Sequence, residues 1–228
     1  MKVLLLNYFQ TDGLTSNEKL ADVAAAMCVG KYTEAANQLE CKNLLPAINS
    51  RHDSVLEHLP LTWVIEDVSR ALTHQLIRHR IASYSQLSQR YAKVQTNKEW
   101  YIEPESIVTY SRNIIDKYRD LMDNIAEFYQ EMISKNIPNE DARMILPNAC
   151  FTSIMVSMNA KSFSEAATLR TCNRAQWEIR QMFKLMRDSI KDVYPHVWEK
   201  CFPNCTKKCG CLETKPCGSP YEKFSSNK

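Results

Sequence analysis

Glycine is scarce in this chain, and its scarcity limits how the protein can hold a phosphorylated ligand. Only four glycines occur among 228 residues, and no two of them are close together within the first two hundred. A dinucleotide-binding fingerprint or a P-loop needs several glycines around one tight turn, so that backbone amides reach the phosphates. The sequence therefore excludes both loops, and side chains must supply most of any phosphate recognition.

Suitable side chains gather between Arg78 and Tyr91, where three arginines, one histidine, three serines and two glutamines occupy fourteen positions. A guanidinium fork matches phosphate oxygens, and each charge-assisted contact contributes roughly 1.5–3 kcal/mol. Serine hydroxyls can complete such a cage. The stretch predicts an anion-binding site. Two alternatives stay open on the residues alone: arginines that only complement a helix dipole, and a nucleic-acid patch.

The residues before this stretch predict a helix over 69–80. Val68, Leu72 and Leu76 recur at four-residue spacing, and Ser69 is a suitable N-cap. The polar run that follows is expected to be a loop returning beside the helix.

Elsewhere, residues 61–65 and 150–158 are typical of strands, and an apolar stripe predicts a helix over about 106–135. Helices and strands without a regular βαβ alternation predict an α+β, or irregular α/β, fold. We expect a single domain with a mixed sheet flanked by helices.

The whole-chain composition is that of a soluble globular protein. Apolar residues make up 44%, charged residues 24%, and the net charge is +3, which argues against extended nucleic-acid binding. No apolar stretch approaches the roughly 20 residues that span a bilayer. The apolar run at the N-terminus breaks at Asn7, too early for a signal peptide. We expect a cytoplasmic protein without a membrane or nucleic-acid partner.

The last residues have a different composition, which divides the chain into a main domain over 1–200 and a cysteine-rich tail over 201–228. The tail carries five of the nine cysteines: Cys201, Cys205, Cys209, Cys211 and Cys217. Four thiolates suit tetrahedral zinc, but the paired CxxC spacing and a histidine are missing. A reduced, mobile appendage is favoured over a metal site, and we assign no metal ligand.

Several blocks together resemble the flavin-dependent thymidylate synthases. Arg78-His79-Arg80, followed by Ser88 and Arg90, matches the RHR-x7-S-x-R signature of that family. Further blocks in the same order are residues 52–58, 69–76, 143–147, 159–162 and 169–178. A lone RHR is a weak signal, whereas this ordered series covers about residues 1–200.

The resemblance implies reductive methylation of dUMP to dTMP. The family takes carbon from 5,10-methylenetetrahydrofolate and hydride from FAD that NADPH has reduced. It is homotetrameric, with active sites where subunits meet. It activates uracil electrostatically rather than through a cysteine adduct, and the corresponding arginine here is Arg170. Cys150 and Cys172 lack the context of a catalytic cysteine and are read as structural.

The resemblance also assigns ligand-binding positions. Those expected to line the flavin are Ser54, Glu57, Arg78, His79, Arg80, Gln86, Asn159, Ala160, Lys161 and Glu165. Those expected to hold dUMP are Gln75, Leu76, Ile77, Arg78, Gln86, Leu87, Ser88, Gln89, Arg90, Arg143 and Arg170.

Three positions depart from common family patterns. Lys161 stands where arginine is usual, Gln86 replaces an acid or asparagine, and Glu165 replaces asparagine or histidine. Because of these departures, an alternative hypothesis remains: the protein is an inactive or regulatory relative that binds dUMP without turnover.

Overall fold

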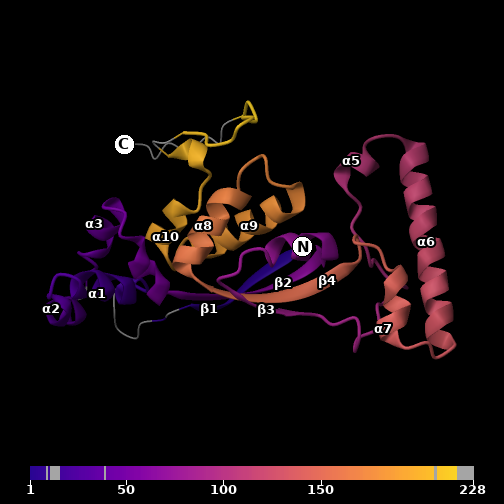
Figure 1. Ribbon diagram of the computed structural model, residues 1–228, viewed down its shortest axis with the longest axis horizontal. Coiled ribbons are helices and arrows are strands. Elements are labelled where there is room, and N and C mark those ends of the chain that lie inside the picture. Colours follow the sequence, from indigo (N-terminus) through magenta and orange to yellow (C-terminus); the bar gives the residue numbers. More distant parts are fainter. Residues whose placement is uncertain (9, 11–15, 39, 208–209, 220–228) are drawn as a thin grey trace. The chain divides into compact units, whose positions relative to one another are not determined.

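The structure of the protein, a computed structural model, describes residues 1–8, 10, 16–38, 40–207 and 210–219 (Figure 1). In chain order its elements are β1 (Lys2–Tyr8), α1 (Lys19–Met27), α2 (Tyr32–Asn37), α3 (Leu44–Asn49), the 3-10 helix η1 (Asp53–His58), β2 (Pro60–Ser69), α4 (Arg70–Leu76), β3 (Ser83–Gln86), α5 (Glu105–Val108), α6 (Arg112–Ser134), α7 (Asn139–Ala142), η2 (Arg143–Ile145), β4 (Phe151–Asn159), α8 (Ala160–Arg170), α9 (Trp177–Ser189), α10 (Pro195–Lys200) and η3 (Asn204–Thr206). This mixture of helices and a small sheet confirms the predicted α+β class.

The sheet has the strand order β1-β2-β4-β3. Two backbone hydrogen bonds fix the direction of its central pair: Ala160 donates to the carbonyl of Leu59, and Arg70 donates to that of Cys150. Low numbers in β2 therefore lie beside high numbers in β4, which is the antiparallel arrangement. We expected a mixed sheet, and the structure has a small antiparallel sheet instead.

The chain divides into two compact units. Unit 1 contains residues 1–65, 76–84 and 155–228, and unit 2 contains residues 66–75 and 85–154. In unit 1, α8 and α9 lie on one face of the sheet (Figure 1). Aromatic rings form these contacts. The ring of Phe163 on α8 stacks on that of Phe183 on α9, with ring centroids 6.1 Å apart, and its centroid lies 4.7 Å from that of Trp63 on β2. All three side chains are fully buried.

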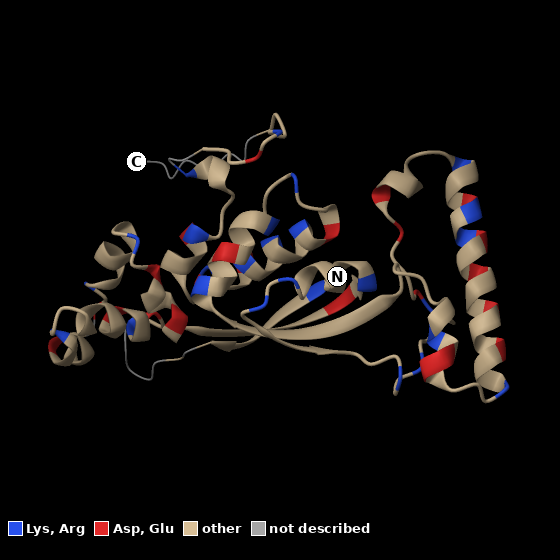
Figure 2. Cartoon of the chain, in the orientation of Figure 1, with Lys and Arg blue, Asp and Glu red and all other residues tan. Residues whose placement is uncertain are grey.

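Unit 2 is built on the long helix α6, which carries both acidic and basic residues along its length (Figure 2). Its buried face carries Met122, which packs with Trp100 and Cys150. The hydroxyl of Tyr129 on the same face accepts a hydrogen bond from the Val94 amide at 3.1 Å. The single domain expected over residues 1–200 stays a prediction.

Two local predictions near the arginine-rich stretch need correction. The helix that begins after Ser69 is confirmed at its start, where the serine hydroxyl accepts from the Leu72 amide at 3.0 Å. It ends at Leu76, however, and not at residue 80. The Tyr84 hydroxyl lies 2.6 Å from the His79 carbonyl and 3.1 Å from the Leu76 carbonyl, so a side chain satisfies the helix end.

The segment expected to be a loop includes the strand β3, because residues 83–86 pair with β4 at the edge of the sheet. The helix expected over 106–135 is divided into α5 and α6. Ser111 caps the start of α6, where its hydroxyl accepts a hydrogen bond from the Ile114 amide. Within the described part of the chain, no helix combines the length and apolar character needed to cross a bilayer.

Candidate active site

The residues predicted to bind ligands fall into two groups, one in each unit. Unit 1 holds Ser54, Glu57, Leu76, Ile77, Arg78, His79, Arg80, Asn159, Ala160, Lys161, Glu165 and Arg170. Unit 2 holds Gln75, Gln86, Leu87, Ser88, Gln89, Arg90 and Arg143.

The structure brings Arg170 and His79 together. Arg170 is the last residue of α8, and its Nε donates a hydrogen bond to Nε2 of His79 at 3.0 Å. An imidazole nitrogen can accept only when it carries no proton, so His79 is neutral with its proton on Nδ1. Burial lowers the pKa of His79, and the charge of Arg170 lowers it further. The Phe183 ring packs edge-on against the imidazole at 5.8 Å.

The same contact constrains the guanidinium. Burial lowers the pKa of Arg170, although a guanidinium stays charged at physiological pH. Because the contact uses Nε, the terminal nitrogens carry the rest of the donor fork. The arrangement therefore offers a partly desolvated, oriented positive charge, which suits stabilisation of a developing anion.

Two of the departures from the family pattern contact each other. Lys161 and Glu165 are four residues apart on α8, and Lys161 Nζ lies 3.4 Å from the Glu165 carboxylate. The Glu57 carboxylate lies at the same distance from this ammonium. The charge of Glu165 raises the pKa of Lys161, and the hydrogen bond to Glu57 adds to that shift. The unexpected acid thus pairs with the unexpected lysine.

The start of α8 explains two further positions. The side-chain oxygen of Asn159 accepts from the Ser162 amide at 2.8 Å and caps the helix. Ala160 is fully buried, and its amide bonds to the Leu59 carbonyl. In this chain both residues fix the geometry of α8, and Lys161 follows directly.

The remaining unit 1 positions differ in exposure. The side chain of Leu76 is fully buried in the core. Side chains that reach solvent belong to Ser54, Glu57, Ile77, Arg78 and Arg80. The two arginines are thus accessible to an anionic ligand.

In unit 2, Arg90 and Arg143 both contact Glu140. Arg90 Nε lies 2.6 Å from the Glu140 carboxylate, and Arg143 Nε donates to the Glu140 backbone carbonyl at 3.2 Å. Sequence reasoning missed Glu140, although it lies one helical turn before Arg143. The structure therefore places the two predicted phosphate-binding guanidiniums around one residue that is partly open to solvent.

The glutamines of the stretch have structural partners. Gln86 Nε2 donates towards the hydroxyls of Thr73 and Thr152 at 3.2 and 3.3 Å. Gln89 is buried, and its Nε2 donates to Cys150 Sγ at 3.4 Å. Burial raises the pKa of the Cys150 thiol to about 11. Such a thiol is a poor nucleophile near neutral pH, which favours the structural interpretation of Cys150.

The last unit 2 positions lie at the surface or beside a cavity. Ser88 Oγ accepts from the Arg90 amide at 3.3 Å. Leu87 and Gln89 line a cavity of about 250 Å³, together with Trp100 and residues 151–153. Gln75, at the end of α4, is partly buried.

The cysteines of the tail do not form a metal centre among the residues that the structure describes, where no group of three potential ligands is suitably placed. Cys209, which the zinc hypothesis included, lies outside the described residues. Cys201, Cys205, Cys211 and Cys217 are not joined in disulfides.

Comparison with known proteins decides the family. The family described as thymidylate synthase complementing protein matches residues 10–196. The chain belongs to this family. Among its relatives, the flavin-dependent thymidylate synthase of Geobacter sulfurreducens is 43% identical over 212 residues, or 90% of this chain and 88% of that protein. The one from Sulfolobus acidocaldarius is 37% identical, over 90% of this chain and 78% of that protein.

Solved structures have a similar fold. Thymidylate synthase X from Helicobacter pylori, crystallised with FAD and dUMP, aligns with a TM-score of 0.66 and 25% identity over 88% of this chain and 98% of that chain. The UMP/dUMP methylase PolB from Streptomyces cacaoi aligns with a TM-score of 0.69 over 87% of this chain and 93% of its own. At 21% identity, PolB supports the fold alone. The predicted membership of the flavin-dependent thymidylate synthases is confirmed.

Proposed function

We propose that this protein converts dUMP to dTMP by reductive methylation at uracil C5. The carbon comes from 5,10-methylenetetrahydrofolate, and NADPH supplies the reducing equivalents through FAD. Family membership supports the activity, and the site residues support the way in which this chain performs it.

The Arg170–His79 contact carries the proposal. Uracil C5 becomes nucleophilic when the ring loses its N3 proton, and a nearby positive charge favours that ionised form. Arg170 supplies the charge on a partly buried guanidinium, and neutral His79 holds Nε at 3.0 Å. Cys150 is poorly suited to form a cysteine adduct, because burial raises the pKa of its thiol to about 11.

Phosphate recognition falls to the other arginines. Arg90 and Arg143 bind the dUMP phosphate, for which the Glu140 carboxylate now stands in on Arg90. A phosphate dianion carries more charge than a carboxylate and accepts a bidentate fork equally well, so it can displace Glu140. Ser88 lies beside Arg90 and adds a hydroxyl donor.

The donor set of unit 1 fits FAD. Without a glycine-rich loop, the pyrophosphate requires cationic side chains, and the exposed Arg78 and Arg80 provide them. Lys161 adds a third cation, oriented by Glu57 and Glu165. When bound, FAD supplies the hydride. The chain's own residues bind and orient the ligands and keep the charge of Arg170 in place.

The assembly is a homotetramer whose active sites lie at subunit interfaces. Exposed apolar side chains on each unit support association. On α6, Ile114, Leu121 and Phe128 recur every seven residues and are 40%, 55% and 52% exposed. On β1, Leu4 and Leu6 are also exposed. Light scattering should give four chains for the wild type and a smaller assembly for Leu121→Glu. We place the enzyme in the cytoplasm, where its free thiols stay reduced.

Anaerobic absorbance spectroscopy tests the catalytic proposal. The protein reconstituted with FAD should be yellow and lose flavin absorption on addition of NADPH. Adding 5,10-methylenetetrahydrofolate together with dUMP should restore the absorption and yield dTMP. Recovery without dTMP, or no bound flavin after reconstitution, would refute the proposal.

A further inference from the structure

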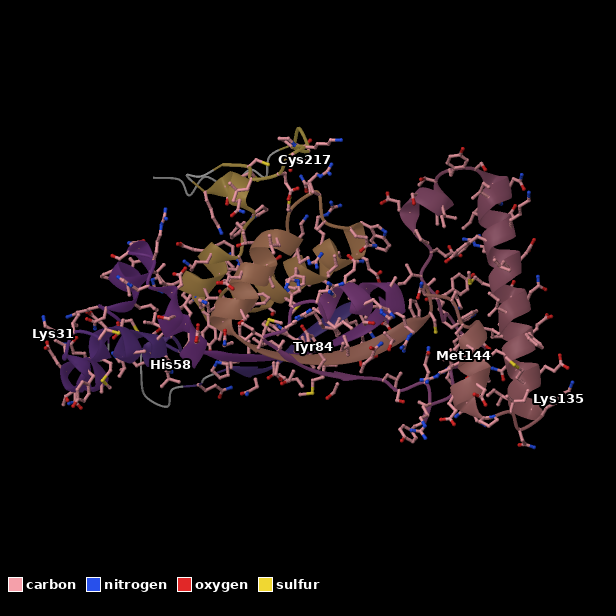
Figure 3. The ribbon with its side chains drawn as sticks, in the orientation of Figure 1. Lys31, His58, Tyr84, Lys135, Met144 and Cys217 are labelled. Atoms are coloured by element: carbon pink, nitrogen blue, oxygen red, sulfur yellow. The ribbon has the colours of Figure 1, made fainter. Side chains whose placement is uncertain are left out.

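The tail begins after the family match ends at residue 196, and it contacts the segment that bears Arg170. Its described residues, 201–207 and 210–219, lie beside the end of α8 and the loop that follows (Figure 1), and Cys217 is labelled in Figure 3. All these residues belong to unit 1. The contacts therefore lie within one compact unit.

Hydrogen bonds from the tail bracket Arg170 on both sides. Before it, the Thr168 hydroxyl donates to the Lys200 carbonyl at 3.1 Å and accepts from Lys207 Nζ at 2.9 Å. After it, Asn173 Nδ2 donates to the Ser219 carbonyl at 2.9 Å. The Thr168 hydroxyl thus uses its one proton and one lone pair to join Lys200, the last residue of α10, and Lys207 in the tail to the last turn of α8.

The tail is itself anchored at its base. Cys201 and Phe202 are buried, and the Arg187 guanidinium lies over the Phe202 ring at 4.5 Å. The Cys201 thiol donates to the Val197 carbonyl at 3.2 Å. Because Cys201 and Phe202 are fixed in the core, the hydrogen bonds from later tail residues can restrain the end of α8.

The centre of the contact is hollow. A cavity of about 270 Å³ lies between the tail and α8, and Leu169, Cys172, Leu212 and Cys217 are among the side chains that line it. Thr168 and Asn173 also line this cavity. The tail therefore holds the end of α8 through a few polar contacts, which single substitutions can remove.

We propose that the tail is a clamp that positions Arg170 for its contact with His79, with Thr168 and Lys207 as the positioning residues. The inference rests on the proposed function for its catalytic consequence. Helix ends open more readily than helix centres, because their last carbonyls lack partners within the helix. Arg170 stands at such an end, and the clamp holds the turn that carries it.

Titration of His79 in the full-length protein tests the clamp directly. The imidazole signals are followed by NMR with labelled histidine, and His79 is assigned from its absence in His79→Gln. Thr168→Val keeps the shape of threonine but removes the hydroxyl, and Lys207→Met removes the ammonium. Both should raise the pKa of His79, because Arg170 no longer holds its charge against the ring. Thr168→Ser and Lys207→Arg should restore the wild-type value.

Lys215→Met is the matched control, since Lys215 lies in the tail on an exposed position and has no hydrogen bond to α8. An unchanged His79 pKa in Thr168→Val and Lys207→Met would overturn the clamp. An equal rise in Lys215→Met would overturn it as well. A rise confined to the first two variants supports it.

Steady-state kinetics provide a second test of the clamp. In Thr168→Val and Lys207→Met, kcat for dTMP formation should fall about tenfold, with KM for dUMP within about twofold, because a misplaced group costs rate more than binding. Wild-type kcat in both variants would count against the clamp. A wild-type protein that forms no dTMP would refute the proposed function, while the His79 titration would still decide the clamp.

Discussion

Arg170 donates a hydrogen bond from Nε to Nε2 of His79 over 3.0 Å, so the neutral state of the histidine and the orientation of the arginine depend on each other. Arg170 ends α8, whereas His79 belongs to the arginine-rich stretch 91 positions earlier. The contact joins two family blocks and gives the proposed chemistry a defined charge.

Replacing Arg170 should abolish most of the turnover without loss of flavin. Arg170→Ala removes the charge that stabilises ionised uracil, and kcat should fall by about 10²–10³-fold, as for the loss of one oxyanion-stabilising donor. Arg170→Lys keeps a charge but loses the fork, and should recover only part of that rate. Steady-state dTMP formation and flavin absorbance are measured together, with Arg112→Lys on the exposed start of α6 as the control. Unchanged kcat in Arg170→Ala would exclude the assigned role.

The stability of the protein should depend on pH through His79. Its pKa is lowered in the folded state from 6.5, first by burial and then by Arg170. The folded state thus favours neutral His79, and the associated stability is present above pH 6.5 and lost as pH falls through the folded pKa. The free energy of unfolding in urea, measured from pH 5 to 8, should decline more steeply on the acid side for the wild type than for His79→Gln. Parallel profiles would contradict this expectation.

Cys150 should not form a covalent bond with dUMP. Its thiol is buried, and burial raises its pKa to about 11. Cys150→Ala should therefore retain turnover while losing about 1–2 kcal/mol of stability from the packing vacancy. Denaturing mass spectrometry of acid-quenched reactions gives the answer: an adduct of dUMP mass on the wild type, absent from Cys150→Ala, would contradict the electrostatic mechanism.

Removing the acid that pairs with Arg90 should tighten dUMP binding. The Arg90–Glu140 pair is largely exposed, and such pairs contribute about 0–1 kcal/mol, so Glu140→Gln should lower Kd by up to roughly fivefold. Deoxyuridine lacks the phosphate and should bind the variant no better than the wild type. Isothermal titration calorimetry compares the two ligands, with Glu131→Gln on α6 as the control. Weaker dUMP binding in Glu140→Gln would mean that the carboxylate orients Arg90 for phosphate instead of competing with it.

Local signals in the sequence predicted the elements that local contacts determine. The Ser69 cap was predictable because its partner, the Leu72 amide, lies three residues away. The end of α4 was not, since it depends on the Tyr84 hydroxyl and on pairing of β3 with a strand far along the chain. Tertiary contacts of this kind override helical periodicity.

The same distinction applies to the site. Ordered family blocks led to the prediction that Arg170 and the arginine-rich stretch form the site, but no periodic pattern indicated that Arg170 would contact His79. The pairing of Lys161 with Glu165 follows from their four-residue spacing on a helix, and was within reach of sequence reasoning. The contact between Arg90 and Glu140 links α7 to the stretch across fifty positions, and only the fold reveals it.

Release of tritium from [5-³H]dUMP tests the central claim most directly, because the proton at uracil C5 must leave when the new carbon is attached. Full-length protein with FAD, NADPH and 5,10-methylenetetrahydrofolate should release tritium to water in step with dTMP formation. Release should cease when the folate is omitted, and should be reduced by about 10²–10³-fold in Arg170→Ala. A flavin-loaded protein that releases no tritium in the complete mixture would contradict the account.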